Sequence, residues 1–260
     1  MSTETAGDVA TPFDDGALYD VLLGALDHDL PFYLGLAKAA NGAVLDVCCG
    51  TGRITLPIRA AGIDVEGLDL SAAMLATLQQ KAAARGLSIH TTQGNMNSFQ
   101  LDRRFALIVC CCNAFVHNLT TAEQLATLEC CRRHLTSGGL LAFDTFFPSP
   151  AIICATDNQR VFELEVKHPD TGLPVRNYDN RKFDRVQQCQ YSINEMEFLD
   201  AAGNVTAVHR SETTMRWTYM FEMELLLRVA GFARWEILGD FDRRPLLKET
   251  DNMIVLAWNG

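Results

Sequence analysis

Two patterns of apolar and polar positions divide this chain of 260 residues. As far as residue 147, short apolar runs alternate with longer stretches in which apolar residues recur every three or four positions. The runs predict buried strands, and the periodic stretches predict amphipathic helices. Because strands and helices alternate, we expect a parallel sheet with helices on both of its faces.

The expected elements can be placed by residue range. Two helices, over 13–26 and 31–39, precede a first strand that begins at Val44. Further strands are predicted over 63–70, 87–92, 105–112 and 140–147, with helices over 53–61, 71–85 and 122–135. Pro57 is expected to distort the first turn of its helix. Helical periodicity is absent from about residue 160, where strands are predicted over 160–167, 175–186, 188–199 and 205–217. A helix over 221–230 and strands over 232–241 and 253–258 complete the chain.

The first strand ends in a glycine-containing turn, within the stretch VLDVCCGTGR from Val44 to Arg53. Glycine lets a backbone approach a ligand closely, and the helix that follows offers unpaired N–H groups to an anion. The second strand ends in Asp69, where an acid can hold a ribose diol. Similar turns also join strands to helices with no ligand present. Thr55 occupies the third glycine position of a dinucleotide-binding turn, which favours a nucleoside with a carboxylate over NAD.

These segments resemble the motifs of class I S-adenosylmethionine-dependent methyltransferases. The first two motifs are matched by DVCCGTGR (46–53) and by GLDLS (67–71) with Met74, and the third is matched by GNM (94–96). The resemblance continues through RHLTSGG (133–139) and LRVAGF (227–232). It implies a Rossmann-like, seven-stranded, mostly parallel sheet with helices on both faces and a small antiparallel β insertion.

The resemblance also assigns parts of the chain to roles. Residues 1–42 would form a tail, expected to be disordered over residues 1–11, and cap helices. Residues 43–147 would form the cofactor-binding half, residues 148–218 an insertion that acts as a lid or a dimerisation sheet, and residues 219–260 the remainder of the fold. Cofactor contacts are implied at Tyr19, Tyr33, Asp46, Cys48, Cys49, Gly50, Thr51, Gly52, Arg53, Asp69, Leu70, Met74, Gly94, Asn95, Met96, Cys111 and Cys112.

Some of these positions are open to other interpretations. Cys48 stands where the family has a glycine, and Asn95 stands where it has an aspartate. Cysteine is small enough for the loop, and Asn95 can still bond an adenine edge. A ring face of Tyr19 or Tyr33 could stabilise a sulfonium by about 0.5–2 kcal/mol. Both tyrosines could equally be packing residues of amphipathic helices.

The segment after the fourth predicted strand is where the family places its substrate. His117 is the candidate catalytic residue, either accepting a proton or orienting the substrate. The alternative is a histidine that packs against the next helix. Asn113, Phe115 and Arg216 are the candidate substrate contacts, although Arg216 could instead form a structural ion pair.

Composition narrows the possible partners. A net charge of −10 without a basic cluster argues against nucleic acid, and no stretch of about 20 apolar residues suggests a membrane span. The first residues lack the features of a signal peptide. Nine cysteines occur without a C-x-x-C motif, which argues for free thiols in a reducing cytoplasm and against a metal site.

The sequence thus predicts a cytoplasmic S-adenosylmethionine-dependent methyltransferase of a small molecule, most simply at nitrogen, which could be a homodimer through the insertion. Methylation of oxygen, carbon or sulfur is the alternative reaction. An adenosylmethionine-binding module that has lost catalysis is the alternative from another class, and Cys48 and Asn95 keep it open.

Overall fold

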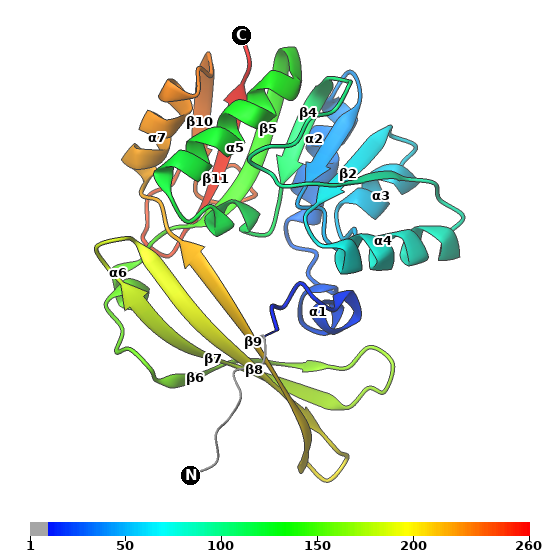
Figure 1. Cartoon of the computed structure of the whole chain (residues 1–260), viewed down its shortest axis with the longest axis vertical. Helices are drawn as coiled ribbons and strands as arrows, with labels where there is room; N and C mark the ends of the chain where they lie inside the picture. The colour runs from blue at the N-terminus through cyan, green and yellow to red at the C-terminus, as the bar shows by residue number, and fades with distance from the viewer. Residues whose placement is uncertain (1–9) are drawn as a thin grey trace.

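The computed structural model describes residues 10–260, so residues 1–9 of the expected tail lie outside the described residues. Within that range the chain forms a seven-stranded sheet flanked by helices and a separate four-stranded sheet (Figure 1). The larger sheet has the strand order β10-β11-β5-β4-β1-β2-β3. Its strands are β1 (Val44–Val47), β2 (Val65–Asp69), β3 (His90–Gln93), β4 (Phe105–Cys110), β5 (Leu135–Phe146), β10 (Arg234–Leu238) and β11 (Asn252–Trp258).

The first five strands of the larger sheet run parallel to one another, and β11 is antiparallel to both β5 and β10. The predicted fold class, a mostly parallel Rossmann-like sheet with an antiparallel insertion, is therefore confirmed. The chain leaves β1 toward β2 and β3 on one side and returns to β4 and β5 on the other. This reversal of strand order lies between β1 and β4, and ligands of open α/β sheets bind at the strand ends beside such a point.

Helices cover both faces of the sheet. They are α1 (Gly16–Leu23), α2 (Leu30–Ala39), α3 (Thr55–Ala60), α4 (Ala72–Ala84), the 3₁₀ helix η1 (Ala114–His117), α5 (Thr121–His134), the short α6 (Pro150–Ile153) and α7 (Met220–Val229). Alternate strand residues serve two cores: Leu45 packs with residues of α5 and α7, whereas Val44 packs with residues of α2 and α3. Strand alternation thus explains why the central strands are apolar on both sides.

The insertion is an antiparallel sheet of order β6-β7-β8-β9. Its strands are β6 (Arg160–Lys167), β7 (Pro174–Asp184), β8 (Cys189–Leu199) and β9 (Val205–Arg216). Val175 and Met196 on one face of this sheet pack with Val21 of α1. We call this the inner face. The opposite, outer face carries ion pairs, including those of Glu195 with Arg160 and Arg210.

Several predicted boundaries were wrong for local reasons. The strand predicted over 105–112 ends at Cys110, and Cys112 and Asn113 adopt left-handed φ values of 60° and 58°. The first helix begins at Gly16 rather than residue 13, because the Asp15 side chain accepts the N–H groups of Ala17 and Leu18 as a cap. Pro57 was expected to distort its helix. Instead α3 begins at Thr55, so Pro57 lies in the first turn, where N–H groups have no intrahelical partner.

Over residues 10–260, none of the helices combines the length and the apolar character that crossing a membrane requires.

Candidate active site

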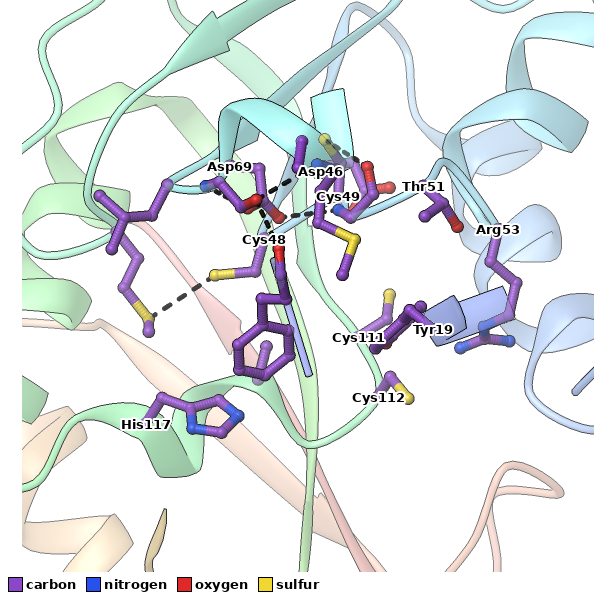
Figure 2. Close-up of a pocket in the computed structure, with 18 of the residues that line it drawn as sticks. Tyr19, Asp46, Cys48, Cys49, Thr51, Arg53, Asp69, Cys111, Cys112 and His117 are labelled. Carbon is purple, nitrogen blue, oxygen red and sulfur yellow. Dashed lines mark hydrogen bonds between the residues drawn. The ribbon is translucent and has the colours of Figure 1, made fainter. Parts of the chain in front are cut away.

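A cavity of about 560 Å³ lies where β1, β2 and β4 end (Figure 2). Its walls come from the glycine turn after β1, the end of β2, the segment after β4 and the chain around α1. It brings together most of the residues that the sequence singled out, namely Tyr19, Asp46, Cys48, Cys49, Gly50, Thr51, Arg53, Asp69, Leu70, Met74, Met96, Cys111, Cys112 and His117.

The glycine turn shapes the floor of this cavity. Gly50 and Gly52 both have left-handed φ values, 52° and 86°. A Cβ added to Gly50 would meet no atom within 4 Å, whereas one added to Gly52 would lie 2.8 Å from Cγ of Leu78. Gly52 is therefore required by packing against α4, while the bare backbone of Gly50 leaves space open in the cavity wall.

Cys48 takes the same left-handed conformation without being glycine. Its φ is 58°, and its Sγ lies 3.9 Å from Sδ of Met96 across the cavity wall. A residue with a Cβ is strained in this region, by about 1–2 kcal/mol. The turn thus survives the replacement of glycine by cysteine, at a cost in backbone strain.

Asp69 closes the turn from the neighbouring strand. Its carboxylate accepts the N–H of Gly50 at 2.8 Å and the N–H of Ser71 at 2.8 Å. Burial raises the pKa of Asp69 above its ordinary value, although these two backbone bonds act in the opposite direction. The end of β2 and the glycine turn are consequently held at a fixed separation.

Asp46 lies beneath the turn. It is buried, and its Oδ2 accepts the hydroxyl of Thr55 at 2.6 Å. Burial raises the pKa of Asp46 to about 7, and the Thr55 hydroxyl acts in the opposite direction. Thr55, which replaces the third glycine of a dinucleotide turn, therefore ties α3 to the end of β1.

Two hydrogen-bonded anchors hold the N-terminal helices over the cavity. Asp20 of α1 accepts the hydroxyl of Thr51 at 2.6 Å and forms an ion pair with Lys81 of α4. Asp29, next to α2, forms a bidentate ion pair with Arg53. These anchors place the ring of Tyr19 in the cavity wall (Figure 2). Burial, followed by the neighbouring Cys112, raises the pKa of Tyr19 far above its ordinary value, so its hydroxyl stays protonated.

The structure does not place Tyr33 in the cavity. This side chain is 0% exposed, and its hydroxyl donates to Oδ1 of Asp144 at 2.6 Å. Asp144 also accepts the N–H groups of Cys112 at 2.9 Å and Asn113 at 2.7 Å. Tyr33 therefore belongs to the group that holds the segment after β4, and the expected contact with a cofactor is corrected.

His117, at the end of η1, points into the cavity (Figure 2). Its Nδ1 lies 3.3 Å from the carbonyl oxygen of Thr214 in β9. Because a carbonyl oxygen can only accept, this bond requires the proton on Nδ1 and leaves the lone pair on Nε2. Burial lowers the pKa of His117, which favours the neutral ring.

Six other predicted site residues also lie outside the cavity wall: Gly52, Gly94, Asn95, Asn113, Phe115 and Arg216. Asn95 accepts the N–H of Asn97 at 3.1 Å in a local turn. Phe115 is a core residue whose ring packs on Phe143. Arg216 is 6% exposed and donates to Glu222 and Gln124, so the structural ion pair is the interpretation that the structure supports.

Sequence reasoning missed part of the wall, namely Thr11, Phe13, Asp14, Ile54, Ser71, Ala72, Ala73 and Ala114. Phe13 is the most informative of these. Its ring meets the ring of His117 edge-on with centroids 5.2 Å apart, and its carbonyl accepts the hydroxyl of Ser71 at 2.7 Å. Nothing in the local sequence marks Phe13, because only the folded chain carries the segment before α1 across the site.

Comparison with known proteins is consistent with this geometry. Residues 44–139 match the family described as "Methyltransferase domain". A protein of Geobacillus sp. (strain WCH70) that carries a provisional methyltransferase name is 35% identical over 180 residues, which cover 62% of this chain and 72% of the relative. The chain belongs to the class I S-adenosylmethionine-dependent methyltransferases.

Two further proteins resemble this methyltransferase over most of its length. The cypemycin N-terminal methyltransferase of Streptomyces sp is 26% identical over 216 residues, or 82% of this chain and 81% of the relative. The X-ray structure of the sugar N-methyltransferase KedS8 from Streptoalloteichus sp ATCC 53650 has a TM-score of 0.74 at 20% identity, covering 100% of this chain and 97% of the other. The second likeness concerns the fold alone. The protein is thus an enzyme whose methyl donor is S-adenosylmethionine.

Proposed function

We propose that this methyltransferase transfers a methyl group to a nitrogen atom of a small molecule. The observation that carries the proposal is His117, a partly buried histidine in the cavity wall whose lowered pKa favours the neutral ring and whose Nε2 lone pair is left available by the Nδ1 contact with Thr214. An amine must be unprotonated before it can attack a methyl group, and a neutral imidazole can take up that proton. Of the similar proteins described above, one is named an N-terminal methyltransferase of cypemycin and another a sugar N-methyltransferase.

The residues of the cavity fit S-adenosylmethionine. Asp69 offers carboxylate oxygens where a ribose diol would be held, and Gly50 leaves space that a side chain would fill. The Tyr19 ring offers a π face that would stabilise a positive sulfur by about 0.5–2 kcal/mol. When bound, the cofactor supplies an activated methyl group, and the protein contributes alignment and exclusion of water.

His117→Gln tests the assigned role of the histidine. The amide can keep a bond to Thr214 but is not a base at neutral pH. We expect kcat to fall by about 10²–10⁴-fold, the usual contribution of general base catalysis, with little change in affinity for S-adenosylhomocysteine. If the rate is unchanged, His117 is only a packing partner of Phe13.

Binding measurements separate this proposal from its alternatives. S-adenosylhomocysteine at a hundred times its dissociation constant would stabilise the protein by about 2.7 kcal/mol, whereas NAD would not. Binding without transfer to any amine, hydroxyl, thiol or carbon acceptor would favour an inactive binding module. Transfer to a hydroxyl, thiol or carbon but to no amine would replace the nitrogen assignment.

We also propose that the outer face of the four-stranded sheet pairs with a second copy of the chain. Phe162, Tyr191 and Ile193 are 54%, 44% and 40% exposed there, interspersed with ion pairs. Exposed apolar side chains grouped on one face mark association sites. Sedimentation of Ile193→Glu against the parent protein tests this: a dimer that becomes a monomer supports the pairing, and a monomeric parent excludes it.

A further inference from the structure

The inner face of the four-stranded sheet carries two buried acceptor oxygens that no described group satisfies. They are Oδ1 of Asn177 and Oδ1 of Asp179, both on β7. The two residues are 8% and 5% exposed. They are separated by one residue on a strand, so both side chains point to the face that bears Val175 and Met196. Buried polar atoms are nearly always hydrogen-bonded, so two neighbouring exceptions require an explanation.

Neighbouring donors form hydrogen bonds with only one carboxylate oxygen of Asp179. Its Oδ2 accepts Nε of Arg181 at 2.6 Å and the hydroxyl of Ser192 at 3.2 Å. Ser192 in turn accepts the side-chain amide of Gln190 at 2.8 Å. The network fixes the carboxylate in position and directs no donor to Oδ1. An oriented, half-satisfied carboxylate beside an unsatisfied amide oxygen is suited to a ligand that brings hydrogen-bond donors.

These acceptors lie on β7, two strands away from β9, the strand whose Thr214 contacts His117 of the active site. Asp179 pairs with Asn194 of β8, which pairs with Ser211 of β9. Three residues further along β9, Thr214 offers the carbonyl that His117 contacts. Two strand spacings across the sheet correspond to about 10 Å, and three residues along β9 to about 10 Å more, so Asp179 lies roughly 14 Å from that carbonyl. A substrate that is longer than one sugar ring could therefore reach from the cavity wall toward β7.

We propose that Asn177 and Asp179 form a substrate subsite for a donor-bearing group, an ammonium or a hydroxyl pair, on the part of the substrate remote from the methyl-accepting atom. This inference rests on the proposed function, because it assumes a small substrate held between the cavity and the sheet. The subsite accepts N–H and O–H donors and disfavours carboxylates. It makes these residues determinants of specificity rather than of the transfer itself.

Saturation-transfer NMR titrations of the protein loaded with S-adenosylhomocysteine test the subsite. Glucosamine is the main probe because it carries an ammonium and hydroxyls. Cyclohexylamine and glucose separate the ammonium from the hydroxyls, and glucuronate tests the rejection of a carboxylate. The variants are Asp179→Asn and Asn177→Leu. Glu195→Gln is the matched control, because Glu195 is an acid of the same sheet on the outer face.

We expect glucosamine to bind the parent protein and the Glu195→Gln control equally. Binding should weaken by about tenfold in Asp179→Asn and in Asn177→Leu, as the loss of one buried hydrogen bond predicts. The affinity for S-adenosylhomocysteine should remain unchanged in all variants, which also shows that they fold. If glucose competes with glucosamine and cyclohexylamine does not, the subsite binds a hydroxyl pair. If cyclohexylamine competes and glucose does not, the subsite binds an ammonium.

Three results would overturn the subsite. One is that glucosamine binds both inner-face variants as tightly as the parent. Another is that glucuronate binds as well as glucosamine. The third is that neither glucosamine, cyclohexylamine nor glucose binds a parent protein that does bind S-adenosylhomocysteine. In all three cases the methyltransferase assignment stands. Failure of S-adenosylhomocysteine to bind would instead count against the proposed function.

Discussion

Replacing Asp144 by Asn should weaken the hydrogen bonds that hold the segment after β4 in place beside the active site. Asp144 lies at the end of β5, and its Oδ1 accepts both the hydroxyl of Tyr33 and the N–H of Cys112. Its Oδ2 accepts the N–H of Asn113 at 2.7 Å. Asparagine keeps a single acceptor oxygen. If that oxygen takes the first two donors, the new amide nitrogen faces the N–H of Asn113, and two buried donors oppose each other.

The expected cost follows from those contacts. Each buried donor without a partner costs about 1–3 kcal/mol, so two donors give a loss of roughly 3 kcal/mol in the free energy of unfolding. Removing the buried charge offsets part of that loss, because burial already raises the pKa of Asp144. Cys112 and Asn113 hold left-handed backbone conformations, which persist only when their surroundings enforce them. We therefore expect the affinity for S-adenosylhomocysteine to fall by about tenfold or more.

Tyr33→Phe is the matched control for this change. It removes one donor to Asp144 and leaves both backbone N–H groups paired. It should cost about 1.5–3 kcal/mol of stability, as a bond to a charged group does, with a smaller effect on ligand affinity. Urea unfolding and calorimetric titration of both variants and of the double variant measure the coupling. If Asp144→Asn is as stable as the parent, or if Tyr33→Phe impairs ligand binding more, the assigned role of Asp144 is wrong.

Three further predictions concern the cavity itself. The pKa of His117 is lowered in the folded protein, so the unfolded state binds the proton more readily. The contribution of His117 to stability should therefore be lost as pH falls below about 6.5. Urea unfolding from pH 8 to pH 5 should show this dependence in the parent protein and not in His117→Gln. Both Gly50→Ala and Gly52→Ala should lower thermal stability, because a Cβ at these left-handed φ values costs about 1–2 kcal/mol of backbone strain. Gly52→Ala should cost more, because its Cβ would also lie 2.8 Å from Cγ of Leu78, whereas Gly50→Ala should chiefly weaken S-adenosylhomocysteine binding; equal effects on stability would contradict this assignment. Cys48→Gly should change the free energy of unfolding by less than about 1 kcal/mol, since relieved strain offsets lost contacts. Cys48→Val should be less stable than Cys48→Gly by about 2 kcal/mol. Guanidinium unfolding of both variants measures these differences.

Most of the fold could be predicted because its signals are local. Apolar runs and helical periodicity placed most strands and helices to within about three residues, although β5 begins at Leu135, five residues before its predicted start. The change of pattern after residue 147 located the antiparallel insertion. The errors lie where a tertiary contact overrides the pattern. The apolar run of β4 continues through Cys111 and Cys112, but Asp144 draws the N–H groups of Cys112 and Asn113 away from the sheet.

The candidate site was predictable where motifs meet at the strand ends. Asp69 ends one strand, and Gly50 and Cys112 follow two others, and parallel strands bring such residues to one edge. Tyr33 and Arg216 were assigned to the site from their residue types, and the structure places both in buried hydrogen-bonded pairs instead. A polar side chain can form its hydrogen bonds either with a ligand or with a neighbouring residue, and the choice is known only once its neighbours in the fold are known.

The sequence by itself determined the order of elements, the glycine turn and the acid at the end of the second strand, because each depends on residues close together in the chain. Only the tertiary structure decided that Phe13 crosses the site, that Thr214 sets the tautomer of His117, and that Oδ1 of Asn177 and Oδ1 of Asp179 receive no donor from the described residues. These features join segments far apart in sequence. Their energies depend on burial and hydrogen-bond geometry, which exist only once the chain has folded.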